Sequence, residues 1–354
     1  MLRHSNPVIR LFINIAFLLF YLVFFQGESS ADQNHKRFHP GILYDNSLTT
    51  DVGFNRQASE GVNRFHRETG TNFIEIFESD SNSTRRRQVL RNMAKDFVNP
   101  IIGVGFGNLS VLRDAAAEFP QTHFIMIDGV IEMPNVQSVV FKEHEGAFLA
   151  GILAGLSSQT KQVGFIGGRD IPPVQRFRCG YSQGVRFASP DIRIIEDMAD
   201  SFIEPEIGRS LSQKQFLQGV DIVFAAAGLT GEGVLEESAR QKKLAIGVDV
   251  NQNSLYPGLV LTSVVKRVDN AVYSALTAAF KNNWKPGVIQ YGLKEDGVGL
   301  AFDLNNEPLI SERMKSGIRF ARQLIMDGKL VVHDASVDQK CPSPEHTFAT
   351  MKDH

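Results

Sequence analysis

The chain has 354 residues, of which 43% are hydrophobic and 21% are charged, and its formal net charge is -2 at pH 7. This length exceeds what one compact core normally holds, so we expect two domains of ordinary globular composition. The balanced charge gives no reason to expect a nucleic acid or an anionic membrane surface as a partner, because binding phosphates requires a basic surface.

The first segment has the pattern of a secretory signal peptide. Arg3 and Arg10 precede the apolar run at 11–25, and small residues close the segment at Ala31. This order of basic, apolar and small residues is typical of exported proteins, and the run is short for a membrane span. We expect residues 1–31 to be removed by cleavage after Ala31. An uncleaved membrane anchor is the alternative.

Apolar runs typical of strands then alternate with amphipathic segments typical of helices. This alternation predicts βαβ units, and hence an α/β protein with parallel sheets flanked by helices. Strands are predicted at 41–45, 72–77, 100–107, 123–128, 136–141, 162–168, 192–197, 220–228, 244–249 and 259–266, and helices at 55–66, 83–97, up to about 119, 143–158, from 172 and at 266–281.

Two of these helices divide the chain into lobes. We expect the helix at 143–158 to cross into a second lobe and the helix at 266–281 to return to the first. The predicted first lobe therefore comprises 38–143 and about 264–288, and the second comprises 144–263 and about 289–334. Residues 335–354 form a tail without a recognisable pattern.

Three motifs allow a functional interpretation and a simpler structural one. GYSQG at 180–184 fits the nucleophile elbow of a hydrolase with Ser182 as nucleophile, but the preceding residues predict a helix where the elbow requires a strand. Its glycines then serve close helix packing. The glycine-rich turns at 103–108 and 228–233 match neither dinucleotide nor triphosphate fingerprints, although glycines there allow a ligand to approach the backbone.

Cysteine and histidine usage offers little chemistry. The chain has only two cysteines, Cys179 and Cys341, which could pair in an oxidising compartment, but their spacing does not decide it. The nine histidines are scattered, and no metal-binding spacing is present. We therefore expect neither a metal nor a cofactor.

Charged side chains stand where predicted strands end. Asp45, Asp128 and Asp249 each close a strand-like run, and Lys266 ends the run at 259–266. The carboxyl ends of parallel strands share one edge of the sheet, where open α/β proteins bind ligands. Solvated loop charges would explain any one of these residues, but the set indicates a binding site.

Two phenylalanines lie in turn-rich segments where an aromatic core residue is less expected. Phe54 belongs to the stretch DVGFNRQ and Phe202 to DSFIEP. Two aromatic faces can hold a flat ring, while carboxylates accept hydrogen bonds from paired hydroxyls or ring N–H groups and a lysine donates one. These parts suit a nucleoside. No nucleophile has an adjacent base, so the site predicts binding rather than catalysis.

At these residues the sequence resembles the basic membrane protein family of bacterial substrate-binding lipoproteins, whose best-understood members are purine nucleoside receptors of ABC transporters. The resemblance keeps the family's order over nearly the whole exported chain. The matching stretches are GFNRQASEG (53–61), FIMIDG (124–129), EGAFLAGILAG (145–155), VGFIGG (163–168), FAAAGLTGEGV (224–234), IGVDVNQ (246–252) and LTSVVKRVDNAV (261–272).

The resemblance implies a type I periplasmic binding fold, with two α/β lobes, three crossovers and the ligand in the cleft between the lobes. It implies that Phe54 and Phe202 stack on the purine while Asp128 reads its edge. Asp249 and Lys266 would hold the ribose hydroxyls. It further implies that the ligand approaches the backbone closely at Gly228. Asp45 and Asn55 would be neighbours of the base.

The sequence departs from the family at its start, because no cysteine for lipid attachment occurs near Ala31. We therefore expect a free monomeric periplasmic protein that binds a purine nucleoside such as adenosine, guanosine or inosine and delivers it to an ABC permease. Two alternatives are an exported nucleoside or ester hydrolase using Ser182, and a sensor that reports to a membrane kinase. A DNA-binding repressor of similar shape is disfavoured, because the amino terminus carries a leader instead of a DNA-binding helix pair.

Overall fold

The computed structural model describes residues 38–45, 53–77, 83–344 and 347, and the predicted signal peptide lies outside them. The chain divides into one unit at Met1–His39 and a second at Pro40–His354, which contains every helix and strand described below. Within the described residues, none of the helices has the length and apolar character needed to span a membrane.

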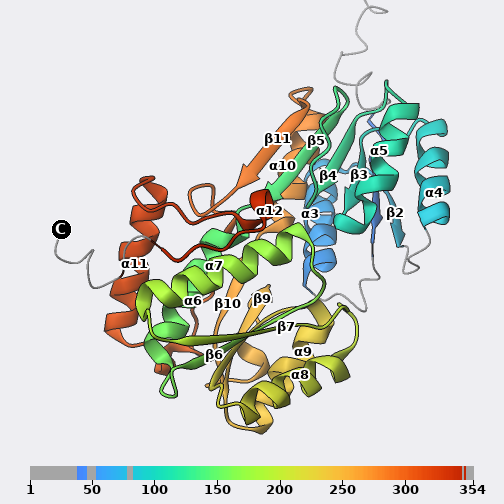
Figure 1. Cartoon of the computed structure of the whole chain (residues 1–354). Helices are drawn as coiled ribbons and strands as arrows, with labels where there is room; N and C mark the ends of the chain where they lie inside the picture. The colour runs from blue at the N-terminus through green and yellow to red at the C-terminus, as the bar shows by residue number, and fades with distance from the viewer. Residues whose placement is uncertain (1–37, 46–52, 78–82, 345–346, 348–354) are drawn as a thin grey trace, which may run out of the picture. The chain divides into compact units, whose positions relative to one another are not determined.

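The second unit contains two six-stranded sheets, each with helices on its faces (Figure 1). The first sheet has the order β11-β5-β4-β3-β1-β2 and is parallel throughout. Its central strands are short runs such as FIMI that are buried along their length, as expected for strands covered on both faces. Its strands are β1 (Gly41–Tyr44), β2 (Ile74–Phe77), β3 (Ile101–Val104), β4 (Phe124–Ile127), β5 (Val136–Phe141) and β11 (Gly287–Tyr291).

The second sheet has the order β12-β10-β9-β8-β6-β7. It is parallel except for β12, which pairs antiparallel with β10 and was not predicted. Its strands are β6 (Gln162–Gly167), β7 (Arg193–Met198), β8 (Ile222–Ala226), β9 (Leu244–Asp249), β10 (Val260–Lys266) and β12 (Val298–Leu300).

We call the first sheet and its helices lobe 1, and the second sheet and its helices lobe 2. The helices of lobe 1 are α3 (Phe54–Thr69), α4 (Ser83–Lys95), α5 (Leu109–Glu118) and α10 (Val268–Phe280), and α10 packs on α3. The helices of lobe 2 are α6 (Glu143–Ser157), α7 (Pro172–Ala188), α8 (Pro205–Leu217), α9 (Gly228–Arg240) and α11 (Glu312–Met326), followed by the short helix α12 (Ala335–Asp338) on α7.

Three connections cross between the lobes, from β5 to α6, from β10 to α10 and from β11 to β12. The fold class and its three crossovers are therefore confirmed. Strand β10 stays in the second sheet as far as Lys266, and β11 continues in the first sheet as far as Tyr291. Both crossings thus fall slightly later in the chain than the boundaries expected at about 264 and 288.

Glycines allow helices α6 and α7 to lie unusually close together. A Cβ atom on Gly184 would lie 2.0 Å from the main-chain oxygen of Phe148, and one on Gly151 would lie 2.2 Å from that of Tyr181. This confirms that the glycines of GYSQG serve helix packing. In lobe 2, the GLTGEG stretch forms the first turns of α9 rather than a loop, and Gly233 packs against the backbone of Pro205.

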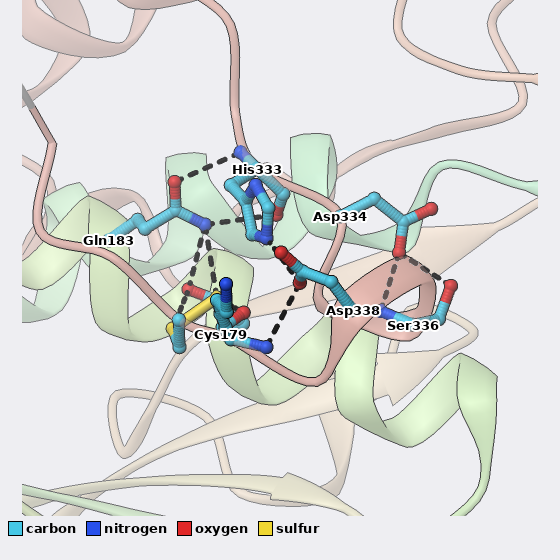
Figure 2. A network of polar contacts seen from close by, with 8 residues as sticks. Cys179, Gln183, His333, Asp334, Ser336 and Asp338 are labelled. Carbon is cyan, nitrogen blue, oxygen red and sulfur yellow. Dashed lines mark hydrogen bonds and ion pairs between the residues drawn. A yellow bond between two sulfur atoms is a disulfide. The ribbon is translucent and has the colours of Figure 1, made fainter.

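The two cysteines, whose pairing the sequence left open, form a disulfide. The Cys179–Cys341 bond joins α7 to the C-terminal segment across a separation of 162 residues, with 5.4 Å between the Cα atoms (Figure 2). The part of the predicted tail that the structure describes therefore lies on lobe 2.

Candidate ligand-binding site

A pocket lies between the lobes at the carboxyl ends of both sheets. Its polar lining comes largely from residues that end or follow strands, with Asp45 after β1, Asp128 after β4, Asp249 at the end of β9 and Lys266 at the end of β10. The space measures about 700 Å³, open solvent included. This is the edge at which open α/β sheets bind ligands.

The predicted site residues come together here. The lining includes Asp45, Phe54, Asp128, Phe202, Gly228, Asp249 and Lys266. Asn55 is fully buried behind the lining, and its side-chain amide donates to Asp45 Oδ1 at 3.3 Å. The apolar remainder was not predicted and includes Phe106, Ile171, Val174, Phe177, Ile203 and Val248.

The two predicted aromatic residues reach the pocket from different lobes. Phe54 is the first residue of α3, and Phe202 lies between β7 and α8. Glycines provide the space that Phe202 occupies, because a Cβ atom on Gly168 would lie 2.1 Å from the Phe202 ring. Gly228 adopts a φ of 56° and lies against the Phe202 backbone. Phe202 thus lies against two residues without side chains, and replacing Gly168 would displace its ring.

Lys266 is the centre of a buried charge network. Its exposed fraction is 2%, and its Nζ lies 2.5 Å from Asp128 Oδ2 and 2.8 Å from Glu143 Oε1. Nζ also lies 4.9 Å from the ring centroids of Phe54 and Phe141. Burial disfavours the ammonium form, but Asp128 and Glu143 outweigh it and raise the pKa of Lys266 to about 12. Lys266 therefore stays charged, with one hydrogen bond to Asp128 and an ion pair with Glu143.

Asp128 keeps one oxygen for another partner. Its Oδ1 is buried and accepts no hydrogen bond from any described residue, while Oδ2 faces Lys266. Burial raises the pKa of the Asp128 carboxyl, and Lys266 opposes this rise. A buried acceptor without a donor is costly, typically about 1–3 kcal/mol. A ligand that donates to Oδ1 would remove this cost.

Two members of the network were missed by sequence reasoning. Glu143, the first residue of α6, is fully buried, and its Oε2 accepts from Arg176 Nε of α7 at 2.5 Å. Burial alone would raise the pKa of Glu143, but Arg176 and Lys266 together hold it below its usual value. The only signal available was a charge at the start of an otherwise apolar helix, since buried charges require partners.

The backbone at two strand ends is shaped for the site. Asp128 and Asp249 adopt φ angles of 70° and 64°, in the left-handed region that aspartate tolerates better than most residues. Gly105, with a φ of 91°, lies against the Asp45 carboxylate, where a Cβ atom would lie 2.0 Å from Oδ2. These conformations turn the chain out of the sheet so that the carboxylates face the pocket.

The position of Ser182 does not fit the hypothesis that it is the nucleophile of a hydrolase. Ser182 lies inside α7, has an exposed fraction of 1% and donates to Glu196 Oε1 at 2.8 Å. It does not line the pocket between the lobes. Among the described residues, no group of three or more His, Cys, Asp or Glu side chains is arranged to hold a metal ion.

A pocket between two such lobes is a site for a small ligand, and the comparisons with known proteins give the class of protein. Residues 40–334 match the family of PnrA-like ABC transporter substrate-binding proteins, and the chain belongs to this family. It is 31% identical to basic membrane protein D of Borreliella burgdorferi, over 90% of this chain and 94% of that protein. It is also 31% identical to a CD4+ T-cell-stimulating antigen of Listeria monocytogenes, over 86% and 92% of the two chains.

Solved structures agree on the fold. An ABC transporter solute-binding protein of Aeropyrum pernix has a TM-score of 0.76 at 24% identity and covers 89% of this chain and 96% of its own. A transcriptional activator of the comK gene from Bacillus halodurans has a TM-score of 0.71 at 19% identity, and the match covers 84% of this chain and 100% of that protein. The same fold therefore occurs in transport and in regulation, so function has to be argued from the site.

Proposed function

We propose that this protein captures a purine nucleoside in the pocket between its lobes and delivers it to an ABC permease. The observation that carries the proposal is the pairing of Phe54 from lobe 1 with Phe202 from lobe 2 in the lining of a pocket that also contains three aspartates. Flat heterocycles and vicinal hydroxyls are the groups that such a lining favours.

The expected contacts are strong enough for useful affinity. Stacking on an aromatic side chain contributes about 1–3 kcal/mol per base, and a hydrogen bond to a charged group about 1.5–3 kcal/mol. In our proposal Phe54 and Phe202 enclose the base, Asp128 Oδ1 accepts from its edge, and Asp249 accepts from the ribose hydroxyls. These contacts offset the ordering cost of binding and support micromolar or tighter affinity.

Lys266 has a modified role in this proposal. It was expected to donate to the ribose, but its ammonium group is already held between Asp128 and Glu143. We assign to it mainly the task of holding Asp128 ionised and oriented. Gly228 offers its backbone and Asp45 lies beside the base, while Asn55 supports the Asp45 carboxylate from behind the lining.

Delivery follows from hinge closure. The lobes are joined by three crossings, and closing them around a ligand buries it and creates a surface that a permease can recognise. In this proposal the protein is exported to the periplasm, acts as a monomer and catalyses no reaction on its ligand.

The test is calorimetric titration with inosine, guanosine and adenosine, with ribose and adenine as partial ligands. We expect nucleosides to bind at micromolar or lower concentration and both fragments to bind far more weakly. Mass spectrometry of the native protein should reveal a co-purified nucleoside, and incubation should leave inosine intact. Binding of ribose alone with the affinity of the whole nucleoside would contradict the proposal.

A further inference from the structure

The C-terminal segment His333–Cys341 lies on helix α7 and is held there by polar contacts and a disulfide (Figure 2). The Cys179–Cys341 disulfide holds one end of it. At the other end, the Gln183 side chain forms two hydrogen bonds with the backbone of His333. Its Nε2 donates to the His333 oxygen and its Oε1 accepts from the His333 nitrogen, both at 3.0 Å. The segment is thus fixed to lobe 2 at two points.

Between these points the segment contacts the network itself. Arg176 Nη1 donates to Ser336 Oγ at 2.9 Å, and Ser336 Oγ donates onward to Asp334 Oδ1 at 2.6 Å. On its other side Arg176 pairs with Glu143, which contacts Lys266, which contacts Asp128 in the pocket. The Ser336 hydroxyl therefore connects Asp334 to Arg176, and from Arg176 a row of charges of alternating sign reaches the pocket.

The segment could not hold this position through its own structure. Its helix, α12, has four residues, and helices this short are not stable by themselves. Ala335 is its one residue counted among the buried hydrophobic core. The disulfide and the bonds to Gln183 are therefore what keep Ser336 against Arg176.

We propose that the C-terminal segment is a positioning element for the ligand site, which acts through Ser336, Arg176 and Glu143 to fix Lys266 and Asp128. A binding site needs outer residues that lock the inner ones, because a pocket that is ordered before binding loses less entropy on binding. The inference rests on the proposed function only for the choice of ligand, since the ordering of Lys266 can be measured without one.

The experiment compares four forms of the full chain, namely wild type, Ser336→Ala, the double variant Cys179→Ala/Cys341→Ala and the control His333→Ala. The control removes an imidazole of the same segment that contacts Asp338 rather than Arg176. Hydrogen exchange of residues 260–266 and 141–145 is measured without ligand, and inosine affinity is measured by calorimetry. Ser336→Ala preserves the disulfide, so it remains informative if the double variant folds poorly.

We expect exchange in both stretches to accelerate in Ser336→Ala and in the double variant, and inosine affinity to fall by roughly tenfold in the double variant, which is about 1.4 kcal/mol. His333→Ala should leave both readouts unchanged. Unchanged exchange and affinity in the double variant, with the C-terminal segment itself exchanging fast, would overturn the positioning role. Absence of inosine binding in wild type would instead refute the nucleoside proposal, while the exchange data still decide the positioning role.

Discussion

The Gln57 side chain donates from Nε2 to the main-chain oxygen of Asp249 at 2.9 Å, across 192 residues of sequence. Gln57 belongs to α3 of lobe 1 and Asp249 to β9 of lobe 2, so this bond connects the lobes directly at the edge of the pocket. It also holds the backbone of a residue with a left-handed φ of 64°.

The first prediction concerns this bond. Replacing Gln57 with alanine should favour the open arrangement of the lobes and weaken nucleoside binding about fivefold, because one net hydrogen bond contributes about 1 kcal/mol. Small-angle scattering without ligand should show a larger radius of gyration, and calorimetry should show the affinity loss. Gln323→Ala, which removes an exposed bond within one helix, is the control and should change neither. An unchanged radius and affinity in Gln57→Ala would show that the bond does not influence closure.

The second prediction separates the sugar from the base. Asp249→Ala should weaken inosine and guanosine by tenfold or more, because a hydrogen bond to a charged group contributes about 1.5–3 kcal/mol. The free bases hypoxanthine and guanine should lose little, since they lack the hydroxyls. Paired titrations of each nucleoside and its base give the comparison. If calorimetry shows equal losses for both, the assignment of Asp249 to the ribose is wrong.

The third prediction concerns the stability provided by Lys266. Lys266→Met leaves the buried Asp128 and Glu143 without their shared cation and should lower the unfolding free energy by about 3–5 kcal/mol at pH 7. Urea unfolding measures the loss. Lys315→Met, which removes an exposed pair with Glu312, is the control and should cost less than about 1 kcal/mol.

The loss of unfolding free energy in Lys266→Met should also depend on pH. The folded pKa of Glu143 lies below its ordinary value of 4.5, so its contribution to stability is present above pH 4.5 and is lost as the pH falls through the folded pKa. Removing Lys266 raises that folded pKa and reduces the contribution. The gap in unfolding free energy between wild type and Lys266→Met should therefore be widest near pH 7 and narrow below pH 4.5. A gap independent of pH would mean that packing, not charge, accounts for the loss.

The fourth prediction uses the charge of the pocket. Its lining contains Asp45, Asp128 and Asp249 against a single ammonium that already has two carboxylate partners. A phosphate group would meet net negative charge, so inosine 5′-monophosphate should bind at least about 100-fold more weakly than inosine. Neutral 5′-O-methylinosine, of intermediate size, should lose much less. Similar losses for the methyl ether and the monophosphate would indicate a steric effect instead.

Periodicity and strand-end chemistry predicted most of the central architecture. The strands at 136–141 and 244–249 have the predicted limits, because continuous apolar runs between polar boundaries leave little choice of register. Strand β11 was missed because it is an exposed edge strand, GVIQY, with no buried run to reveal it. The antiparallel strand β12 was missed because it has three residues.

Some residues of the site could likewise be predicted from the sequence, and others could not. Carboxylates at strand ends could be located because chain direction alone brings them to one edge of the sheet. The partners of Lys266 could not, because Glu143 and Arg176 lie on helices whose packing brings them together only in three dimensions. Ser336 and Arg176 are 160 residues apart in the sequence, and no local pattern encodes such a contact.

The positions of β11 and β12 in the chain affect how the protein can fold during its synthesis. One edge strand of the first sheet, β11, is made only after residue 286, and one edge strand of the second sheet, β12, only after residue 297. A ribosome must therefore translate more than four-fifths of the 354 codons before either half can acquire its complete set of strands. Neither sheet can therefore be completed until late in translation, and the folding of both halves waits for the same short stretch of the chain.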